Sequence, residues 1–300
     1  MASEAQVPAL AAGPSRPGSI RSSRTGRRIV LYAVLVAGAA VAILPFLYML
    51  ANSLKTYGET ITRTAANPFD PRFWPSAAQW GNYAEAWRDA DFSLYFKNSV
   101  IIAITTVAGV FFTSIPAAYA FAKLRFRGRD LIFAVLLATL MVPEEVLLIP
   151  NFLTIVTFGW IDQLPGLTVP FMGSAFFIFL LRQFFAQVPN TIIESAKIDG
   201  LSNLGIIGRI VLPLTRGPLF TVGFLAFTGA WNALQWPLVV TQTPTWRPLT
   251  VGLTTFINEA AALIHLRLAG SMIALLPVVV VYIIAQRQIT EAIARTGLKG

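Results

Sequence analysis

The chain has 300 residues, of which 55% are apolar and only 12% charged, with a net charge of +9 and a mean hydropathy of +0.65. A soluble domain carries about a quarter charged residues, so this composition excludes an ordinary soluble protein. The absence of cysteine excludes disulfides and thiolate metal sites.

The N-terminal region begins as a polar tail and continues as an apolar run. Residues 1–28 are rich in Ala, Pro, Gly, Ser and Arg, which predicts a disordered cytoplasmic tail. The run that follows is too long for the apolar part of a signal peptide, so we expect an uncleaved anchor. In all, six runs are long enough to cross a hydrocarbon core of about 30 Å, which takes about 20 helical residues. They cover approximately 29–51, 99–121, 131–149, 167–181 with its flanks, 219–240 and 268–285.

Positive charges between these runs predict their orientation. They gather before the first run and after the second, fourth and sixth, which places these loops and both chain ends in the cytoplasm. Loop 52–98 balances its five basic residues with five acidic ones. We therefore expect an all-α polytopic protein with six transmembrane helices over 29–298. Membrane orientation accounts for the net charge, and we expect no nucleic-acid partner.

Little in the sequence points to catalysis. The single histidine, His265, precedes the last run and is expected to be a solvated loop residue. We find no glycine-rich phosphate loop, nucleophile elbow or metal-binding pattern, so no catalytic, metal or cofactor site is predicted. The runs also contain almost no ionisable residues and no apparent repeats, both of which are expected of a secondary carrier. Passage of a solute across the membrane, driven from elsewhere, is the function that remains.

A polar segment, TIIESAKIDGLSNLGIIGRIVLP, separates the fourth and fifth runs at residues 191–213. Asn190 and Ser202 are predicted to cap two short helices, Gly200 to end the first in a left-handed turn, and Pro213 to end the second. Either this helix–turn–helix docks into a partner's groove, or it lies on the lipid headgroups. The side chains expected on its apolar side are Ile192, Ile193, Ala196, Leu204, Ile207, Ile210 and Val211.

The same segment resembles the EAA motif of importer-type ABC permeases. Glu194-Ser195-Ala196, Gly200 and Ile210-Val211-Leu212-Pro213 stand at the motif's spacing, with Ser195 in place of its first alanine. The stretches NSVIIAITTVAGVFFTSIPAAYAFAKLRFRGRD, MVPEEVLLIPNFL and GAWNALQWPLV are similar to sugar permeases of maltose-type importers, in the order found in the smaller permease subunit. The resemblance covers roughly residues 30–298.

This resemblance implies a type I ABC importer permease fold with cytoplasmic coupling helices at about 190–212. It also implies several partners: a second permease subunit that forms a heterodimer with this chain in the lipid bilayer of a prokaryotic cytoplasmic membrane, ATPase subunits that bind ATP–Mg, and an external solute-binding protein. The residues implied to couple to the ATPase are Glu194, Ser195, Ala196, Asp199 and Gly200, with Leu212 and Pro213 at the junction to the fifth run.

A second polar cluster, on the fifth run, is a candidate solute path. Trp231, Asn232, Gln235 and Trp236 offer aromatic faces and amides, which suit a sugar. On a continuous helix Trp231 and Gln235 share one face, and Asn232 and Trp236 the next. The alternative is that tryptophan marks a membrane interface and the amides bind neighbouring helices.

Two pairs of polar residues are expected near the outer surface. Glu144 and Glu145 follow Pro143 near the outer end of the third run, and Asn258 and Glu259 precede the last. Contact with a binding protein and plain solvation both remain open for them.

The solute itself stays undetermined at this stage. A carbohydrate is expected, with glycerol phosphate or another polyol derivative as the alternative, although the runs offer no basic pocket for a phosphate. A non-transporting membrane scaffold that recruits a cytoplasmic partner is a further alternative.

Overall fold

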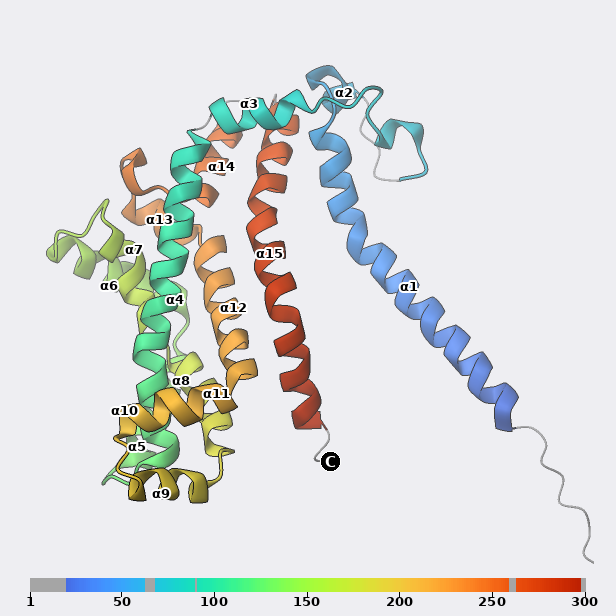
Figure 1. Ribbon diagram of the computed structural model, residues 1–300. Helices are drawn as coiled ribbons and strands as arrows, with labels where there is room; N and C mark the ends of the chain where they lie inside the picture. The colour runs from blue at the N-terminus through green and yellow to red at the C-terminus, as the bar shows by residue number, and fades with distance from the viewer. Residues whose placement is uncertain (1–19, 63–67, 90, 259–262, 298–300) are drawn as a thin grey trace, which may run out of the picture. The chain divides into compact units, whose positions relative to one another are not determined.

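The computed structural model describes residues 20–62, 68–89, 91–258 and 263–297, and over these ranges the chain is helical with no β-strand (Figure 1). The chain divides into two compact units, Met1–Tyr48 and Met49–Gly300. Three of the described helices are long and apolar enough to cross a membrane, and the number reaches six if each of three bent pairs is one span. The all-α membrane fold is confirmed, while the six spans and the sides of the chain ends stay predictions.

The first helix, α1, covers Ile20–Ser53 and includes the first predicted span. It begins before the apolar run, so residues 20–28, the last part of the predicted tail, belong to this helix. The reason is that an apolar helix propagates into the adjoining arginine-rich turn, because adding a residue to an existing helix costs far less than starting one. Residues 1–19 of the predicted tail lie outside the described residues.

Three short helices connect α1 to the next long helix: α2 (Tyr57–Thr62), η1 (Pro71–Phe73) and α3 (Gly81–Asp89). They are held around a buried lysine. Lys55 Nζ donates to Asn52 Oδ1 and to the Arg72 carbonyl, both at 2.9 Å. Asn82 Nδ2 donates to the carbonyls of Ser53 and Lys55 at 2.8 and 2.9 Å. The two bonds from Lys55 satisfy a charge that would be costly to bury alone, and the two from Asn82 attach α3 to the end of α1 and to Lys55.

The central helix of the larger unit is α4 (Phe92–Lys123), which packs against α7, α8 and α12. Glycine permits the closest of these contacts. A Cβ on Gly109 would meet the side chain of Met172 at 2.2 Å, so a larger residue at this position would have to displace Met172 of α7. Small residues serve the same purpose in helix packing within membranes.

The third predicted span, 131–149, is wrong as a single helix. It consists of α5 (Arg129–Ala138), a turn η2 (Thr139–Met141) and α6 (Glu144–Thr157), and the two parts meet at 100°. The cause is Pro143, which forces Val142 into an extended conformation (φ −84°, ψ 118°).

The fourth predicted span is bent more gently. Its two parts, α7 (Leu164–Met172) and α8 (Ala175–Ala186), meet at 44°. Gly173 ends α7 in an extended conformation, and Ser174 begins α8 by accepting a hydrogen bond from the Phe177 amide.

The fifth predicted span, 219–240, is also wrong as one helix. It is divided into α12 (Arg216–Asn232) and α13 (Gln235–Val240), with Ala233 and Leu234 between them in non-helical conformations. The chain continues through η4 (Pro244–Trp246), α14 (Leu249–Asn258) and α15 (Ile264–Gly297), which contains the sixth predicted span. In Figure 1, α12 lies beside both α4 and α15, in agreement with their contacts.

Candidate functional site

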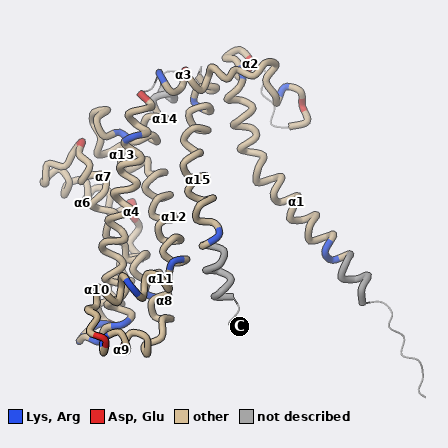
Figure 2. Tube along the Cα trace, in the orientation of Figure 1, with Lys and Arg blue, Asp and Glu red and all other residues tan. Residues whose placement is uncertain are grey.

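The segment between α8 and α12 forms two short helical runs, as the sequence predicts. The first is α9 (Asn190–Ile198). The second consists of α10 (Asn203–Ile206), a π-helical turn η3 (Ile207–Val211) and α11 (Leu212–Leu214). We call residues 190–214 the α9–α11 segment. It lies at the end of α4 opposite to α3 (Figure 1), where Lys and Arg gather together with a smaller acidic stretch at α9 (Figure 2).

Gly200 makes the turn between the two runs. Its φ of +81° is left-handed, as predicted. The Gly200 amide donates to the Lys197 carbonyl at 3.0 Å, and the Leu201 amide donates to the Ala196 carbonyl at 2.9 Å. These two bonds form a Schellman motif, in which glycine is preferred because it has no Cβ. Ser202 then caps the second run by accepting a hydrogen bond from the Gly205 amide at 3.2 Å, also as predicted.

Asn190 does not cap α9, and that prediction is wrong. The helix begins at Asn190 itself, after an extended Pro189. Asn190 Oδ1 instead accepts a hydrogen bond from Lys123 Nζ at 2.9 Å. A tertiary partner has replaced the local capping bond, because the cationic lysine is a stronger donor than a backbone amide.

The two faces of α9 differ in character. Ile193 and Ala196 are buried in a core cluster with residues of α4, α8 and α12. Ala196 therefore keeps α9 close to its own chain and is not presented to the surroundings. Glu194, Ser195 and Ile198 are exposed, and we call them the outer face of α9.

This outer face is more apolar than predicted. Ile198 is 87% exposed. Ile192 and Leu204 were expected on the buried side but are 41% and 76% exposed. Those two predictions are wrong because Ile193 is the residue of α9, and Ile206 the residue of α10, that packs into the core cluster, so Ile192 and Leu204 remain outside it. Exposed large apolar side chains next to Glu194 and Asp199 are typical of a surface that a protein partner covers.

The second run ends later than predicted. Pro213 lies within α11, and the run ends at Thr215, where it meets α12 at 90°. The π-helical turn explains how proline is accommodated, since the Leu212 amide donates to the carbonyl of Ile207, five residues back. This wider turn relieves the contact that proline makes with the preceding turn of an ordinary helix. Leu212 and Pro213 thus stand at the junction with α12.

The residues of the candidate solute path separate into buried and exposed members. Trp231 is 2% exposed, stacks on Phe227 at 5.6 Å between ring centroids, and donates from Nε1 to the Ala274 carbonyl at 3.0 Å. It therefore joins α12 to α15, which favours the packing alternative for this residue. Trp236, on α13, is likewise buried and donates to the Gly166 carbonyl at 2.9 Å.

Asn232 and Gln235 are exposed on either side of the α12–α13 break. The break removes the helical spacing on which the predicted pairing of Trp231 with Gln235 depends, so that pairing is wrong. Thr250 Oγ1 donates to the Ala233 carbonyl at 2.6 Å and satisfies one acceptor that the break leaves free. The two amides thus stand beside irregular backbone, an arrangement that membrane proteins use to line polar cavities.

Other predicted residues have different surroundings. Glu144 and Glu145 are exposed in the first turn of α6, where the helix dipole stabilises negative charge. His265 is not a solvated loop residue, because it lies in the first turn of α15, is 7% exposed and has its ring 6.3 Å from that of Tyr57. Asn258 ends α14, and Glu259 lies outside the described residues.

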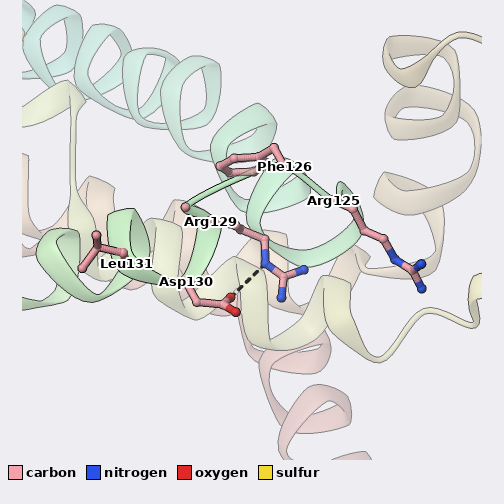
Figure 3. A pocket seen from close by; sticks show the side chains of 6 residues that line it. Arg125, Phe126, Arg129, Asp130 and Leu131 are labelled. Atoms are coloured by element: carbon pink, nitrogen blue, oxygen red, sulfur yellow. Dashed lines mark hydrogen bonds and ion pairs between the residues drawn. The ribbon is translucent and has the colours of Figure 1, made fainter.

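The basic loop after α4 contains a pocket of about 420 Å³ that the sequence does not predict. Arg129 Nε is paired with Asp130 Oδ1 at 2.9 Å, and Arg125 extends away from this pair (Figure 3). With one arginine neutralised and the other directed elsewhere, the pocket offers no concentrated positive charge. Nor does any group of His, Asp or Glu in the described ranges have the arrangement of a metal site.

Comparison with known proteins agrees with this architecture. Residues 109–295 match the family described as "Binding-protein-dependent transport system inner membrane component". The diacetylchitobiose uptake system permease protein NgcG of Streptomyces coelicolor is 30% identical, covering 89% of this chain and 87% of its own. The arabinooligosaccharides transport system permease protein AraQ of Bacillus subtilis is 29% identical, over 91% and 96%. The sn-glycerol-3-phosphate transport system permease protein UgpE of Yersinia pestis is 32% identical, over 71% and 79%.

The fold also matches a solved structure. A chain of a bacterial ABC transporter involved in the import of the acidic polysaccharide alginate superimposes with a TM-score of 0.77 at 24% identity, covering 91% of this chain and 99% of that one.

Apolar helices long enough to cross a membrane, together with this family match, define a membrane permease. The chain belongs to the family of binding-protein-dependent transport system inner membrane components, and it is an ABC importer permease.

Proposed function

We propose that this chain is one of two permease subunits of an importer that carries a carbohydrate into the cell, with ATP–Mg bound and hydrolysed by partner ATPase subunits. The observation that carries the proposal is the α9–α11 segment, an ordered helix–turn–helix whose outer face exposes Glu194 and Ile198. A surface of this kind, in a family of transport components without a nucleotide site of their own, suits docking to an ATPase.

In this proposal the outer face of α9 fits a groove on the ATPase, and Asp199 and Gly200 complete the contact. Only a difference in affinity between two conformations lets ATP binding shift the permease from one to the other. The Schellman turn supports this role because it holds the two helical runs at a fixed angle, so that a force on α9 reaches α10 without loss in a flexible loop.

The proposed solute is an oligosaccharide, delivered by an external binding protein. Names of two relatives support this class, since NgcG serves diacetylchitobiose uptake and AraQ arabinooligosaccharide transport. Asn232 and Gln235 are the residues proposed to contact it, because exposed amides can donate to and accept from sugar hydroxyls.

The second candidate solute is glycerol 3-phosphate, which the 32% identity to UgpE favours. An anion of this kind needs positive charge along its path. Neither Asn232 nor Gln235 supplies any, so this candidate requires that the second permease subunit provide it.

The proposal is tested on the complex purified from membranes and reconstituted in proteoliposomes. An ATP-binding subunit is expected to co-purify with the chain. Hydrolysis is expected to accelerate when the external binding protein is loaded with diacetylchitobiose or an arabinooligosaccharide. Acceleration by glycerol 3-phosphate alone would favour the second candidate, and the absence of any ATP-binding subunit would favour a membrane scaffold.

A further inference from the structure

Two side chains at the end of α4 hold the two halves of the α9–α11 segment. Tyr119 and Lys123 are four residues apart, and side chains at this spacing share one face of a helix. Lys123 Nζ donates to Oδ1 of Asn190 at 2.9 Å, and the Tyr119 hydroxyl donates to Oδ1 of Asn203 in a long bond of 3.4 Å. Asn190 is the first residue of α9, and Asn203 is the first residue of α10. One face of α4 therefore contacts the start of each helix.

Lys123 makes the stronger of the two connections. Its ammonium group has three hydrogens, and it has three acceptors: Asn190 Oδ1 and the carbonyls of Ala186, at 3.3 Å, and Val188. The two carbonyls lie at the C-terminal end of α8, where the helix dipole favours a cation. The lysine thus joins α4, α8 and α9 through one atom.

Apolar contacts continue the connection inward. Tyr119 is 1% exposed and belongs to a core cluster with Ala196 of α9 and Ile206 of α10. A displacement of the α9–α11 segment must therefore either displace the end of α4 or break this packing.

The opposite end of α4 is fixed to a different part of the chain. Asn98 Nδ2 donates to the carbonyls of Thr245 and Arg247, both at 3.0 Å, and Ser99 Oγ accepts a hydrogen bond from the Leu249 amide at 2.7 Å. Over its whole length α4 is a continuous helix of about 48 Å, at 1.5 Å a residue, and the two sets of contacts lie about 38 Å apart along it at most. The other predicted spans of this unit that pack on α4 are divided at 173–174 and 233–234.

We propose that Tyr119 and Lys123 are positioning residues that fasten both coupling helices to α4, so that α4 carries their movement to the 245–249 loop at its other end. This inference rests on the proposed function, because it requires an ATPase that moves the α9–α11 segment. It adds to that function a route within this chain and the two side chains that begin it.

The test compares variants in the complete complex reconstituted in proteoliposomes, and it measures solute molecules transported for each ATP hydrolysed. Lys123→Met removes the three donors but keeps an unbranched apolar chain. Loss of a charged hydrogen bond shifts an equilibrium about tenfold or more, here the one between attached and detached coupling helices, so we expect the ratio to fall about tenfold. Lys123→Arg keeps the charge in a planar group that reaches only some of the acceptors, so an intermediate ratio is expected. Tyr119→Phe removes only the long bond, and about a twofold loss is expected.

Arg127→Met is the matched control, since Arg127 is an exposed cation in the loop that follows α4. It is expected to keep the wild-type ratio, and all four variants are expected to retain the ATPase subunit on purification. A wild-type ratio in Lys123→Met would overturn the inference. So would loss of the ATPase subunit from Lys123→Met and Lys123→Arg alike, because the lysine would then serve folding or docking. Failure of the proposed function itself shows in the wild-type complex, as an absence of carbohydrate-stimulated hydrolysis.

Discussion

At the scale of single residues, Gly200 gives the most direct prediction. No atom lies within 4 Å of a Cβ placed on Gly200, so only its φ of +81° opposes a larger residue. A β-branched side chain in this conformation costs on the order of 1–2 kcal/mol or more. We expect Gly200→Val to disrupt the Schellman turn. The variant is then expected to lose the solute-stimulated ATP hydrolysis of the reconstituted complex, while the chain still inserts in the membrane.

Gly200→Asn is the matched control, because asparagine tolerates the left-handed conformation. It is expected to keep most of the stimulated hydrolysis. Equal loss in the asparagine and valine variants would show that bulk at the contact, and not backbone conformation, decides coupling. Normal uptake by Gly200→Val would contradict the docking role of this turn.

Glu59 gives a prediction about pH. Its pKa is lowered from 4.5 to about 2, first because the Ser76 side chain donates a hydrogen bond to it and also because the Thr56 and Ser76 amides do. The carboxylate therefore stabilises the α1–α4 connection fully above pH 4.5, and this stability is lost as the pH falls from 4.5 towards 2. We expect hydrogen exchange at the Ser76 amide to accelerate over that range, and Glu59→Gln to make the exchange rapid already at pH 7.

Asp70, in the same connection between α1 and α4, provides the control for the Glu59 prediction. Its pKa is also lowered to about 2, because the Arg72 side chain and amide donate to it. In Asp70→Asn we expect the acid-induced exchange at Ser76 to persist, since Glu59 and its partners are intact. A loss of the pH dependence in Asp70→Asn would contradict the role of Glu59.

The residues predicted correctly from the sequence are those whose environment is local. Gly200 and Ser202 follow from the chemistry of a turn and a cap within five residues of chain, and both are confirmed. Asn190 and His265 were predicted wrongly because their environments come from distant segments, Lys123 of α4 in one case and α2 in the other. The sequence analysis used Lys123 only as one of the positive charges after the second run, because nothing in the sequence identifies the carbonyls of Ala186 and Val188 as its hydrogen-bond acceptors.

At the scale of elements, the breaks in the predicted spans divide into two kinds. Pro143 marks the 100° bend between α5 and α6, because proline disfavours helix at the residue before it. The break between α12 and α13 has no such residue at Ala233 or Leu234. The break is stabilised by the hydrogen bond from Thr250 and by the packing of Trp231 against α15 and of Trp236 against α7. These are contacts between distant segments, which the hydropathy of the sequence does not predict.

The break between α12 and α13 predicts opposite outcomes for substitutions at Trp231 and Gln235, which a continuous helix would place on one face. Trp231→Ala removes a buried ring and its hydrogen bond to Ala274, and it is expected to destabilise the protein by about 3–5 kcal/mol. Gln235→Ala changes only an exposed amide, and it is expected to leave thermal unfolding unchanged while raising the KM for solute uptake. Thermal unfolding in detergent and uptake by proteoliposomes measure the two effects.

The comparison also decides between the alternatives for this cluster. A normal KM in both Gln235→Ala and Asn232→Ala would remove these amides from the solute path. An unchanged unfolding temperature in Trp231→Ala would contradict its role in joining α12 to α15.

At the scale of the whole molecule, hydropathy and charge predicted the all-α membrane fold. The length of an apolar run is set by the thickness of the bilayer, and loop charge by orientation in it, so neither requires knowledge of which helices pack together. The division at Tyr48 and Met49 was not predicted, since it reflects contacts between helices. The number of crossings also depends on whether each bent pair spans the bilayer, which length and composition leave open.

Orientation in the membrane supports the last prediction, on which the docking of any ATPase depends. The chain contains no cysteine, so a single introduced thiol reports its own side of the membrane. Phe69, 94% exposed between α2 and α3, and Ile198, 87% exposed on α9, lie in loops predicted to face opposite sides. A membrane-impermeant maleimide is expected to label Phe69→Cys in cells whose cytoplasmic membrane is intact, and Ile198→Cys only once that membrane is opened. Labelling of Ile198→Cys from outside would put the outer face of α9 beyond the reach of cytoplasmic ATP-binding subunits, and the coupling role of the α9–α11 segment would have to be abandoned.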